Sequence, residues 1–267
     1  MRAGRERWRS LALFVMVCGA LPGHVGAAAA PEQAPSAAPT AAVASPSEQR
    51  IYRGAYYRRG APPASAQLFW YERWIKEEGG LLRATHVHHA PDGRVVLRQS
   101  ALHSPDYTLA RFDSEQRQTG VKVQASVLGR GRVRLERSSG SEHESVELQY
   151  RHPLVVGPTL YGFLRRHWDE LISGRGVVFD YLSVERLDTY AFELRRVASD
   201  TETVSFEIAP SSWVLSLLVS PLRVVFDART HQALRYEGPS PVLLESGSKL
   251  ESFDARIEYS ERAAVFR

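Results

Sequence analysis

From residue 51 onward, apolar and polar side chains alternate along most of the chain. Val204, Phe206 and Ile208 fall on one side of an extended strand, and Ser205 and Glu207 fall on the other. A period of two is typical of antiparallel strands with one buried face and one face in water. The same alternation occurs in four further segments, at 121–127, 146–150, 190–194 and 253–259.

Short segments rich in Gly, Pro, Asp and Ser separate these strands. They lie at 91–93, 129–131, 138–142, 227–230 and 237–241. Turn signals at this spacing indicate about ten strands, most of them linked as hairpins. A meander of this length has to curl in order to protect its edges. We therefore predict a mainly β fold, in which a long antiparallel meander curls into an open barrel or bent sheet.

One segment, 158–176, has the helical period instead. Its apolar residues gather on one helical face, and they are Leu160, Phe163, Leu164, Trp168, Leu171 and Ile172. Thr159 is suited to cap the start of the helix, and Gly174 to end it in the left-handed conformation. This predicts one long α-helix whose apolar face, including Phe163 and Trp168, packs into the concave side of the sheet.

The segment 211–227, SSWVLSLLVSPLRVVFD, is the least polar part of the chain after the N-terminal region. Pro221 prevents a helix from continuing through it, so we expect a short apolar helix or a bent crossover between two strands. Such an element is either a plug of the core or the rim of a ligand site. The candidate ligand contacts, on this segment and on the long helix, are Phe163, Trp168, Trp213, Leu217 and Leu218.

The N-terminus has the pattern of an export signal. Four Arg in the first nine residues precede the apolar run LALFVMV at 11–17, and Val25 and Ala27 fit the small-x-small rule for cleavage;. We predict a signal peptide over 1–27, a disordered Ala/Pro/Ser linker over 28–49, and a single β-rich domain over 50–267, located in the periplasm;. Two alternatives stay open: an uncleaved anchor, and a lipoprotein anchored through Cys18.

Sequencing of the N-terminus tests this prediction directly. In protein recovered from its source, we expect a soluble chain that begins between Ala28 and Pro31, because the alanine-rich exit offers the cleavage site there;. Finding Met1 retained, or a lipid attached to Cys18, would contradict the prediction.

Charge and cysteine content exclude several classes of protein. The whole chain has a formal net charge of +4, but the signal segment holds four Arg and one Glu, so the remainder is near +1. That is too little basic charge to favour nucleic-acid binding. The single cysteine, Cys18, lies in the signal segment, so the mature chain has no disulfide framework;. The apolar run at 11–17 is too short to span a bilayer as a helix, and we expect no transmembrane span in the mature chain;.

Few residues suggest chemistry. His86 and His88 would share one face of a strand, but no third ligand is placed beside them, and a solvated strand face explains them equally well;. Glu72 lies between aromatic residues without a visible partner;. Nucleophile-elbow, phosphate-loop and dinucleotide motifs are absent from the sequence;. We assign no catalytic residue, no metal ligand and no cofactor, and nothing in the sequence argues for an enzyme.

Segments at 71–100, 163–194, 210–227 and 233–238 resemble a set of exported bacterial proteins of unassigned function. The resemblance extends from about Tyr71 to Tyr259 and implies no activity. In shape, a long meander curled around a helix is also similar to the lipoprotein-localisation carrier (LolA/LolB-like) superfamily. That likeness implies a space that shields acyl chains between an open barrel and its helices.

Three function classes follow for this domain. The first is non-enzymatic binding of a lipid or another apolar ligand in the periplasm. The second is a structural or assembly factor of the cell envelope that acts through contacts with another protein. The third, an enzyme acting on an envelope substrate, has the least support. A continuous apolar pocket between helix and sheet would favour the first class, and a solid core with an exposed apolar patch would favour the second.

Overall fold

The computed structural model describes residues 48–62, 64–212, 221–247 and 249–260. The chain divides into Met1–Val43 and Ala44–Arg267, and every described residue belongs to the second unit. The predicted signal peptide, the predicted linker up to residue 47 and the predicted short apolar helix therefore lie outside the described residues. The first strand begins at Glu48, so the last two residues of the predicted linker belong to it.

The first half of the domain is a meander in which each strand pairs antiparallel with the next. Its strands are β1 (Glu48–Arg58), β2 (Phe69–Glu78), β3 (Leu81–His89), β4 (Val95–His103), β5 (Leu109–Gln116), β6 (Val121–Gly129), β7 (Arg132–Ser139) and β8 (Glu142–Gln149).

The second half begins with two helices and then forms another meander. After β9 (Leu154–Val155) come the helices α1 (Gly157–Arg166) and α2 (Trp168–Ile172). The strands that follow are β10 (Val177–Ser183), β11 (Asp188–Ser199), β12 (Thr203–Pro210), β13 (Leu222–Asp227), β14 (Ala233–Pro239), β15 (Leu244–Ser246), β16 (Lys249–Glu251) and β17 (Asp254–Ser260). β15 and β16 form a separate hairpin.

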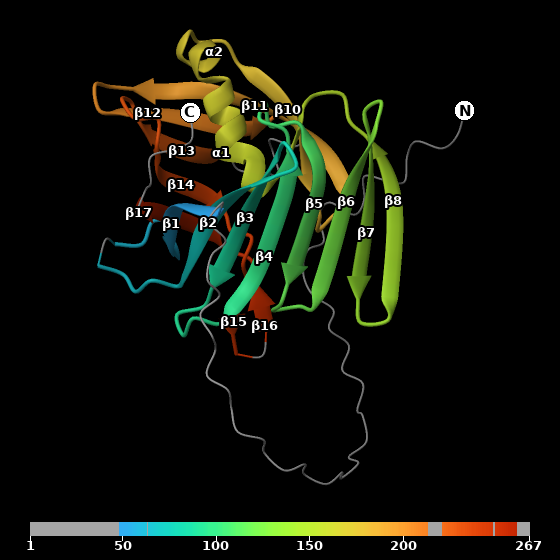
Figure 1. Cartoon of the computed structure of the whole chain (residues 1–267). Coiled ribbons are helices and arrows are strands. Elements are labelled where there is room, and N and C mark those ends of the chain that lie inside the picture. Colours follow the sequence, from blue (N-terminus) through green and yellow to red (C-terminus); the bar gives the residue numbers. More distant parts are fainter. Residues whose placement is uncertain (1–47, 63, 213–220, 248, 261–267) are drawn as a thin grey trace. The chain divides into compact units, whose positions relative to one another are not determined.

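The pairing of β1 with β17 joins the two meanders into one sheet of 15 strands. Its order is β8-β7-β6-β5-β4-β3-β2-β1-β17-β14-β13-β12-β11-β10-β9, and β10 with β9 is its parallel pair. In Figure 1 the blue-to-green strands of the first half continue through β1 and β17 into the orange and red strands of the second half. The sheet is not closed, because β8 and β9 remain its two edges. The predicted mainly antiparallel β fold is thus confirmed.

The two ends of the sheet nevertheless approach each other. Thr189 Oγ1 donates a hydrogen bond to the Gln149 carbonyl over 3.2 Å, and Arg137 donates one to the Glu185 carbonyl over 3.3 Å. One apolar cluster joins the inner side chains of β4 to β7 with Leu154, Leu182 and Leu187 from the opposite end. A second, larger cluster holds the inner faces of β1, β2 and β10 to β14 against the helices.

The alternation in the sequence correctly predicted which side chains face inward. Val204, Phe206 and Ile208 of β12 are buried, as are Ala255, Ile257 and Tyr259 at the C-terminal end. The expected number of strands was too low, since the sheet alone holds 15. Strands such as β2 carry aromatic residues on both faces, and this obscures a period of two.

The predicted long helix is divided at His167, whose φ of −100° and ψ of 18° end α1 and begin α2. Phe163 and Trp168 are five residues apart, which places them about 140° apart around a straight helix. The break lets both side chains point into the interior, Phe163 against Phe179 and Trp168 against Phe206. α1 contacts β3, β4 and β9, and α2 contacts β11 (Figure 1).

Thr159 and Gly174 both lie at the ends of the helical segment, but Thr159 lies within the first turn of α1 and is not its N-cap residue. α1 begins at Gly157, so Thr159 is its third residue, where its Oγ1 accepts a hydrogen bond from the Val156 N–H over 3.1 Å. Gly174 has a φ of +88° and ends the segment as predicted;. Neither α1 nor α2, the helices in the described ranges, has the length and apolarity needed to cross a bilayer.

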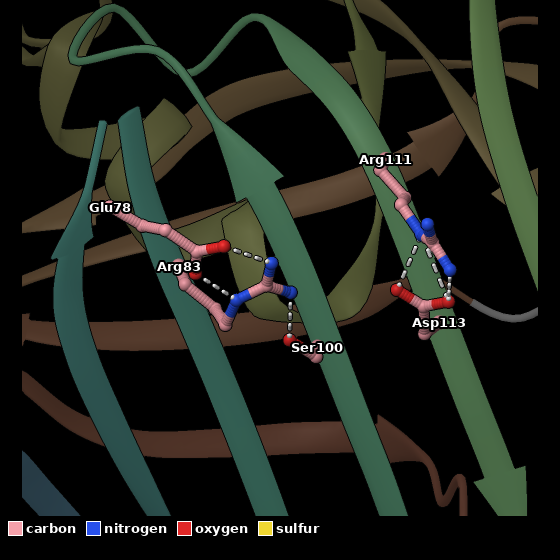
Figure 2. Close-up of polar contacts among 5 residues, drawn as sticks. All are labelled: Glu78, Arg83, Ser100, Arg111 and Asp113. Carbon is pink, nitrogen blue, oxygen red and sulfur yellow. Dashed lines mark hydrogen bonds and ion pairs between the residues drawn. The ribbon is translucent and has the colours of Figure 1, made fainter. Parts of the chain in front are cut away.

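On the outer face of the sheet, charged side chains are paired across and along the strands. Figure 2 shows Arg83 of β3 bonded to both carboxylate oxygens of Glu78, at 2.6 and 3.0 Å, and to Ser100 of β4. On β5, the Arg111 guanidinium lies 2.9 Å from Asp113. Such exposed pairs contribute little stability, but they keep this face solvated and neutralise its arginines.

Candidate functional site

Two of the five predicted ligand contacts lie in the described part of the chain, and both are buried beneath the helices. Phe163 is 2% exposed and packs on Phe179 and His167. Trp168 is 7% exposed and stacks on His231, with ring centroids 3.9 Å apart. Trp213, Leu217 and Leu218 lie outside the described residues. Phe163 and Trp168 have the places expected of the helix face, and their contact with a ligand stays a prediction.

Beside these apolar contacts, the inner face carries a concentration of polar side chains, of which the sequence analysis had considered only His86 and His88. We call it the interior polar cluster. It consists of Tyr52 and Tyr56 on β1, Tyr71 and Arg73 on β2, His86 and His88 on β3, His103 on β4, Tyr161 on α1, and Tyr259 on β17. All nine side chains are buried.

Strand geometry and one glycine bring these side chains together. Residues two apart on a strand share a face, so Tyr71 and Arg73 both point inward, as do His86 and His88. Gly54 lies between Tyr52 and Tyr56, and a Cβ at this position would be 2.4 Å from the ring of Tyr71. The absence of a side chain at Gly54 therefore lets the Tyr71 ring lie against β1.

Tyrosine hydroxyls form a hydrogen-bonded chain from the sheet to α1. Tyr71 donates to the Tyr259 hydroxyl over 2.9 Å, and Tyr259 is in turn hydrogen-bonded to the Tyr161 hydroxyl. Burial raises the pKa of Tyr52 to about 12, and it raises the pKa values of Tyr71, Tyr161 and Tyr259 well above the ordinary value. These hydroxyls therefore stay neutral and act as hydrogen-bond donors and acceptors, not as bases.

Arg73 is the charged member of the cluster. It is 4% exposed, and its Nη1 lies 3.1 Å from His86 Nε2 and also donates to the Pro158 carbonyl at the start of α1. Its guanidinium carbon lies 5.9 Å from the centre of the Tyr52 ring. Across the described residues, no aspartate or glutamate forms an ion pair with Arg73. By contrast, the outer-face arginines in Figure 2, Arg83 and Arg111, are each paired with a carboxylate.

The energetic consequence of this burial is considerable. Removing a charge from water without an opposite charge nearby costs several kcal/mol, even after the surroundings relax. Two neutral acceptors and an aromatic ring offset part of this cost for Arg73. A buried guanidinium of this kind is a place where an anion would be bound more strongly than on the surface, because the local dielectric constant is low.

The histidines of the cluster are neutral. Burial lowers the pKa of His88 to about 3, and burial, then Arg73 and His88, lower that of His86 well below the ordinary value. The prediction that His86 and His88 share a face is confirmed, whereas the solvated strand face is wrong, because that face turns inward under α1. No group of three or more His, Cys, Asp or Glu side chains within the described ranges is arranged to hold a metal ion.

Two imidazole nitrogens in the cluster are buried without a hydrogen-bond partner among the described residues. His88 Nδ1 lies 2.9 Å from the Tyr56 hydroxyl, which leaves its Nε2 without a hydrogen bond. His103 Nδ1 lies 2.7 Å from the Ser104 carbonyl, and its Nε2 is likewise unsatisfied. Unpaired buried polar atoms are rare in folded proteins and each costs free energy.

α1 closes the cluster from one side. Its residues Leu160, Phe163 and Leu164 are buried against the sheet, and Tyr107 of the β4–β5 loop lies over Gly162, where a Cβ would be 1.7 Å from the tyrosine ring. Two open hollows, of about 640 and 430 Å³, lie on the outside of the sheet around Arg59 and Gly60. Neither hollow lies between α1 and the sheet, where Leu160, Phe163 and Leu164 belong to the apolar core.

A signal for Arg73 was present in the sequence. The segment 69–75 places Phe69, Tyr71, Arg73 and Ile75 on one face of a strand, so that a charge interrupts an otherwise apolar face. The residue considered instead, Glu72, points outward and pairs with Arg50 over 2.8 Å. The clustering with α1 and β17 had no such signal, because those segments are far apart in the sequence.

Comparison with known proteins shows little similarity. No family model matches the chain, and no curated protein matches its sequence. Among solved structures, the chain is similar to a β-barrel-like protein from Brucella abortus that contains the domain of unknown function DUF1849. The two are 11% identical, the match covers 82% of this chain and 98% of the other, and the TM-score is 0.47. No relation to the lipoprotein-localisation carriers is shown.

Proposed function

We propose that this chain is an exported protein that binds an amphiphilic ligand, without catalysis, between α1 and the inner face of the sheet. The observation that carries the proposal is the interior polar cluster, a group of converging polar side chains inside an otherwise apolar and aromatic interior. Binding sites for small ligands have this composition: a mostly apolar lining with a few polar groups that orient the ligand.

The unsatisfied groups support a ligand over a purely structural role. A core built only for stability would be filled with apolar side chains, since partly satisfied polar groups cost free energy. The cluster instead keeps a guanidinium without a carboxylate and two imidazole nitrogens without partners. A ligand that supplies hydrogen-bond partners and charge at this place would recover part of that cost.

The close packing of α1 on the sheet defines how such a ligand enters. α1 has to move away from the sheet, and the apolar chain of the ligand then covers the inner side chains that Leu160, Phe163 and Leu164 cover in the closed form. The ligand buries again the apolar area that the movement of α1 exposes. The remaining free-energy cost is that of populating the open form, in which α1 has moved away from the sheet. The apparent affinity is reduced by the fraction of molecules that are open.

The export part of the proposal is supported by the sequence alone. The arginine-rich start, the apolar run at 11–17 and the alanine-rich exit support a location outside the cytoplasm;. A periplasmic domain has direct access to membrane lipids and their breakdown products.

A second candidate is an envelope assembly factor that binds another protein. The burial of Leu160, Phe163 and Leu164 of α1 against the sheet favours it. The exposed large apolar side chains of the described residues are scattered over different strands, however, and they are Leu128, Val178, Val197 and Leu250. They do not form a patch of the kind that marks a protein interface.

Native mass spectrometry separates the two candidates. We expect protein purified from its source to carry one lipid-sized adduct, and protein that has been unfolded, stripped and refolded to regain such an adduct when mixed with an extract of envelope lipids. Refolded protein that binds nothing from the extract, while its circular dichroism and melting temperature match those of the original, would contradict lipid binding and favour the assembly factor.

A further inference from the structure

We propose that Arg73 is the anchor for an oxyanion, so that the ligand is an amphiphile with a carboxylate or phosphate at the end of an apolar chain. This inference rests on the proposed function and specifies the ligand class of the same site. It is drawn from the charge balance of the interior polar cluster and from the contact between Arg73 and α1.

Among the described residues, the partners of Arg73 are neutral dipoles, and no carboxylate forms an ion pair with it. Its hydrogen-bond partners are a ring nitrogen of His86 and the carbonyl of Pro158. The nearby Tyr52, Tyr71 and His88 are buried and neutral at pH 7. The charge of Arg73 is therefore not paired among the described residues, and a ligand that carries one negative charge would balance it.

The contact with Pro158 indicates where the anion would lie. The Pro158 carbonyl belongs to the first turn of α1, and it accepts a hydrogen bond from the Arg73 guanidinium in the closed form. When α1 moves away, this neutral acceptor leaves with it. A carboxylate or phosphate oxygen can then take its place and form a charge-assisted hydrogen bond, which is about twice as strong as a neutral one.

The shape of the guanidinium fits this role. It presents five N–H donors in a planar fork that matches the two oxygens of a carboxylate or phosphate. The hydroxyl of Tyr259, which accepts from Tyr71 and is bonded to Tyr161 of α1, becomes a further donor when Tyr161 moves away with α1;. The apolar chain of the ligand continues from the head group into the aromatic interior formed by Phe206, Phe226 and Trp168.

The test compares two ligands that differ only in charge. cis-Parinaric acid, a fluorescent fatty acid, and its methyl ester have the same chain, but only the acid is anionic at pH 7.5. We expect the protein to bind the acid at least tenfold more tightly than the ester. Competition by palmitate and by lysophosphatidate then shows whether the head group is a carboxylate or a phosphate, and inorganic phosphate alone should not displace the probe.

Variants of Arg73 assign the preference to this residue. R73M keeps an apolar stem of similar length, and R73Q keeps a neutral donor for the Pro158 carbonyl; both should bind acid and ester with equal affinity. The matched control is R83M, which removes one arginine from the outer face (Figure 2) and should retain the full preference.

Each outcome decides one of the two proposals. Equal affinities of the unmutated protein for acid and ester would overturn Arg73 as an anchor for an oxyanion, while the proposed ligand binding would stand. A tenfold preference that persists in folded R73M or R73Q overturns the role of Arg73. Displacement of the probe by inorganic phosphate alone would show that an anion binds without an apolar chain, which would overturn the amphiphilic ligand. Failure of the original protein to bind either probe overturns the proposed function itself.

Discussion

Replacing Trp168 by alanine should lower the free energy of unfolding by about 3–5 kcal/mol, as large aromatic deletions in packed interiors do. Trp168 is buried where α2 meets the second half of the sheet, in contact with Phe206, Phe226 and His231. α2 has only five residues, so its position depends on this side chain and on Leu171. For a domain of this size, the melting temperature should fall by about 10 °C or more.

The matched control is Trp74→Ala on the outer face. Trp74 is half-buried, and its ring faces the Arg50 guanidinium carbon at 6.0 Å, without other aromatic neighbours in the described residues. We expect a loss of about 1 kcal/mol, within the range of ordinary single substitutions. Urea denaturation followed by circular dichroism measures both values. Equal losses for the two variants would contradict the packing described for α2.

Acid should destabilise the domain well above the pH at which its carboxylates titrate. His86 and His88 are held neutral by burial, with folded-state pKa values below the ordinary 6.5, about 3 in the case of His88. Below pH 6.5 the unfolded chain binds protons that the folded chain does not, so the stability falls as the pH falls. For His88 the loss between pH 7 and pH 5 is about 2 kcal/mol, and His86, whose pKa is lowered in the same direction, adds to it;.

Denaturation curves at pH 7, 6 and 5 measure this loss, and His88→Gln identifies its source. Glutamine can still accept the hydrogen bond from Tyr56 but does not titrate, so the loss should shrink by about 2 kcal/mol;. His143→Gln, on the exposed surface of β8, is the control and should leave the loss unchanged. Carboxylates with a lowered pKa, such as Glu147 and Asp227, act only at lower pH. A flat profile between pH 7 and pH 5 would contradict neutral, buried histidines.

Much of the fold follows from local patterns that involve neighbouring residues only. The alternation at 204–208 and 253–259 predicted which side chains of β12 and β17 are buried, because the period of a strand is independent of its partners;. Gly174 could be recognised as a helix end, since its left-handed conformation suits glycine;. The apolar face of the helical segment likewise identified Phe163 and Trp168 as inward-facing residues.

The candidate site depended on tertiary structure. On β2 both faces carry aromatic residues and a charge: Phe69, Tyr71 and Arg73 on one, Trp70, Glu72 and Trp74 on the other. The period of two separates these sets but does not say which faces inward. That choice is made when β1 pairs with β17 and α1 covers the face that bears Arg73. The pairing joins residues about 200 positions apart, and the bend at His167 depends on packing against β10 and β12. Such long-range contacts decide burial, and burial gives Arg73 and the histidines their unusual properties.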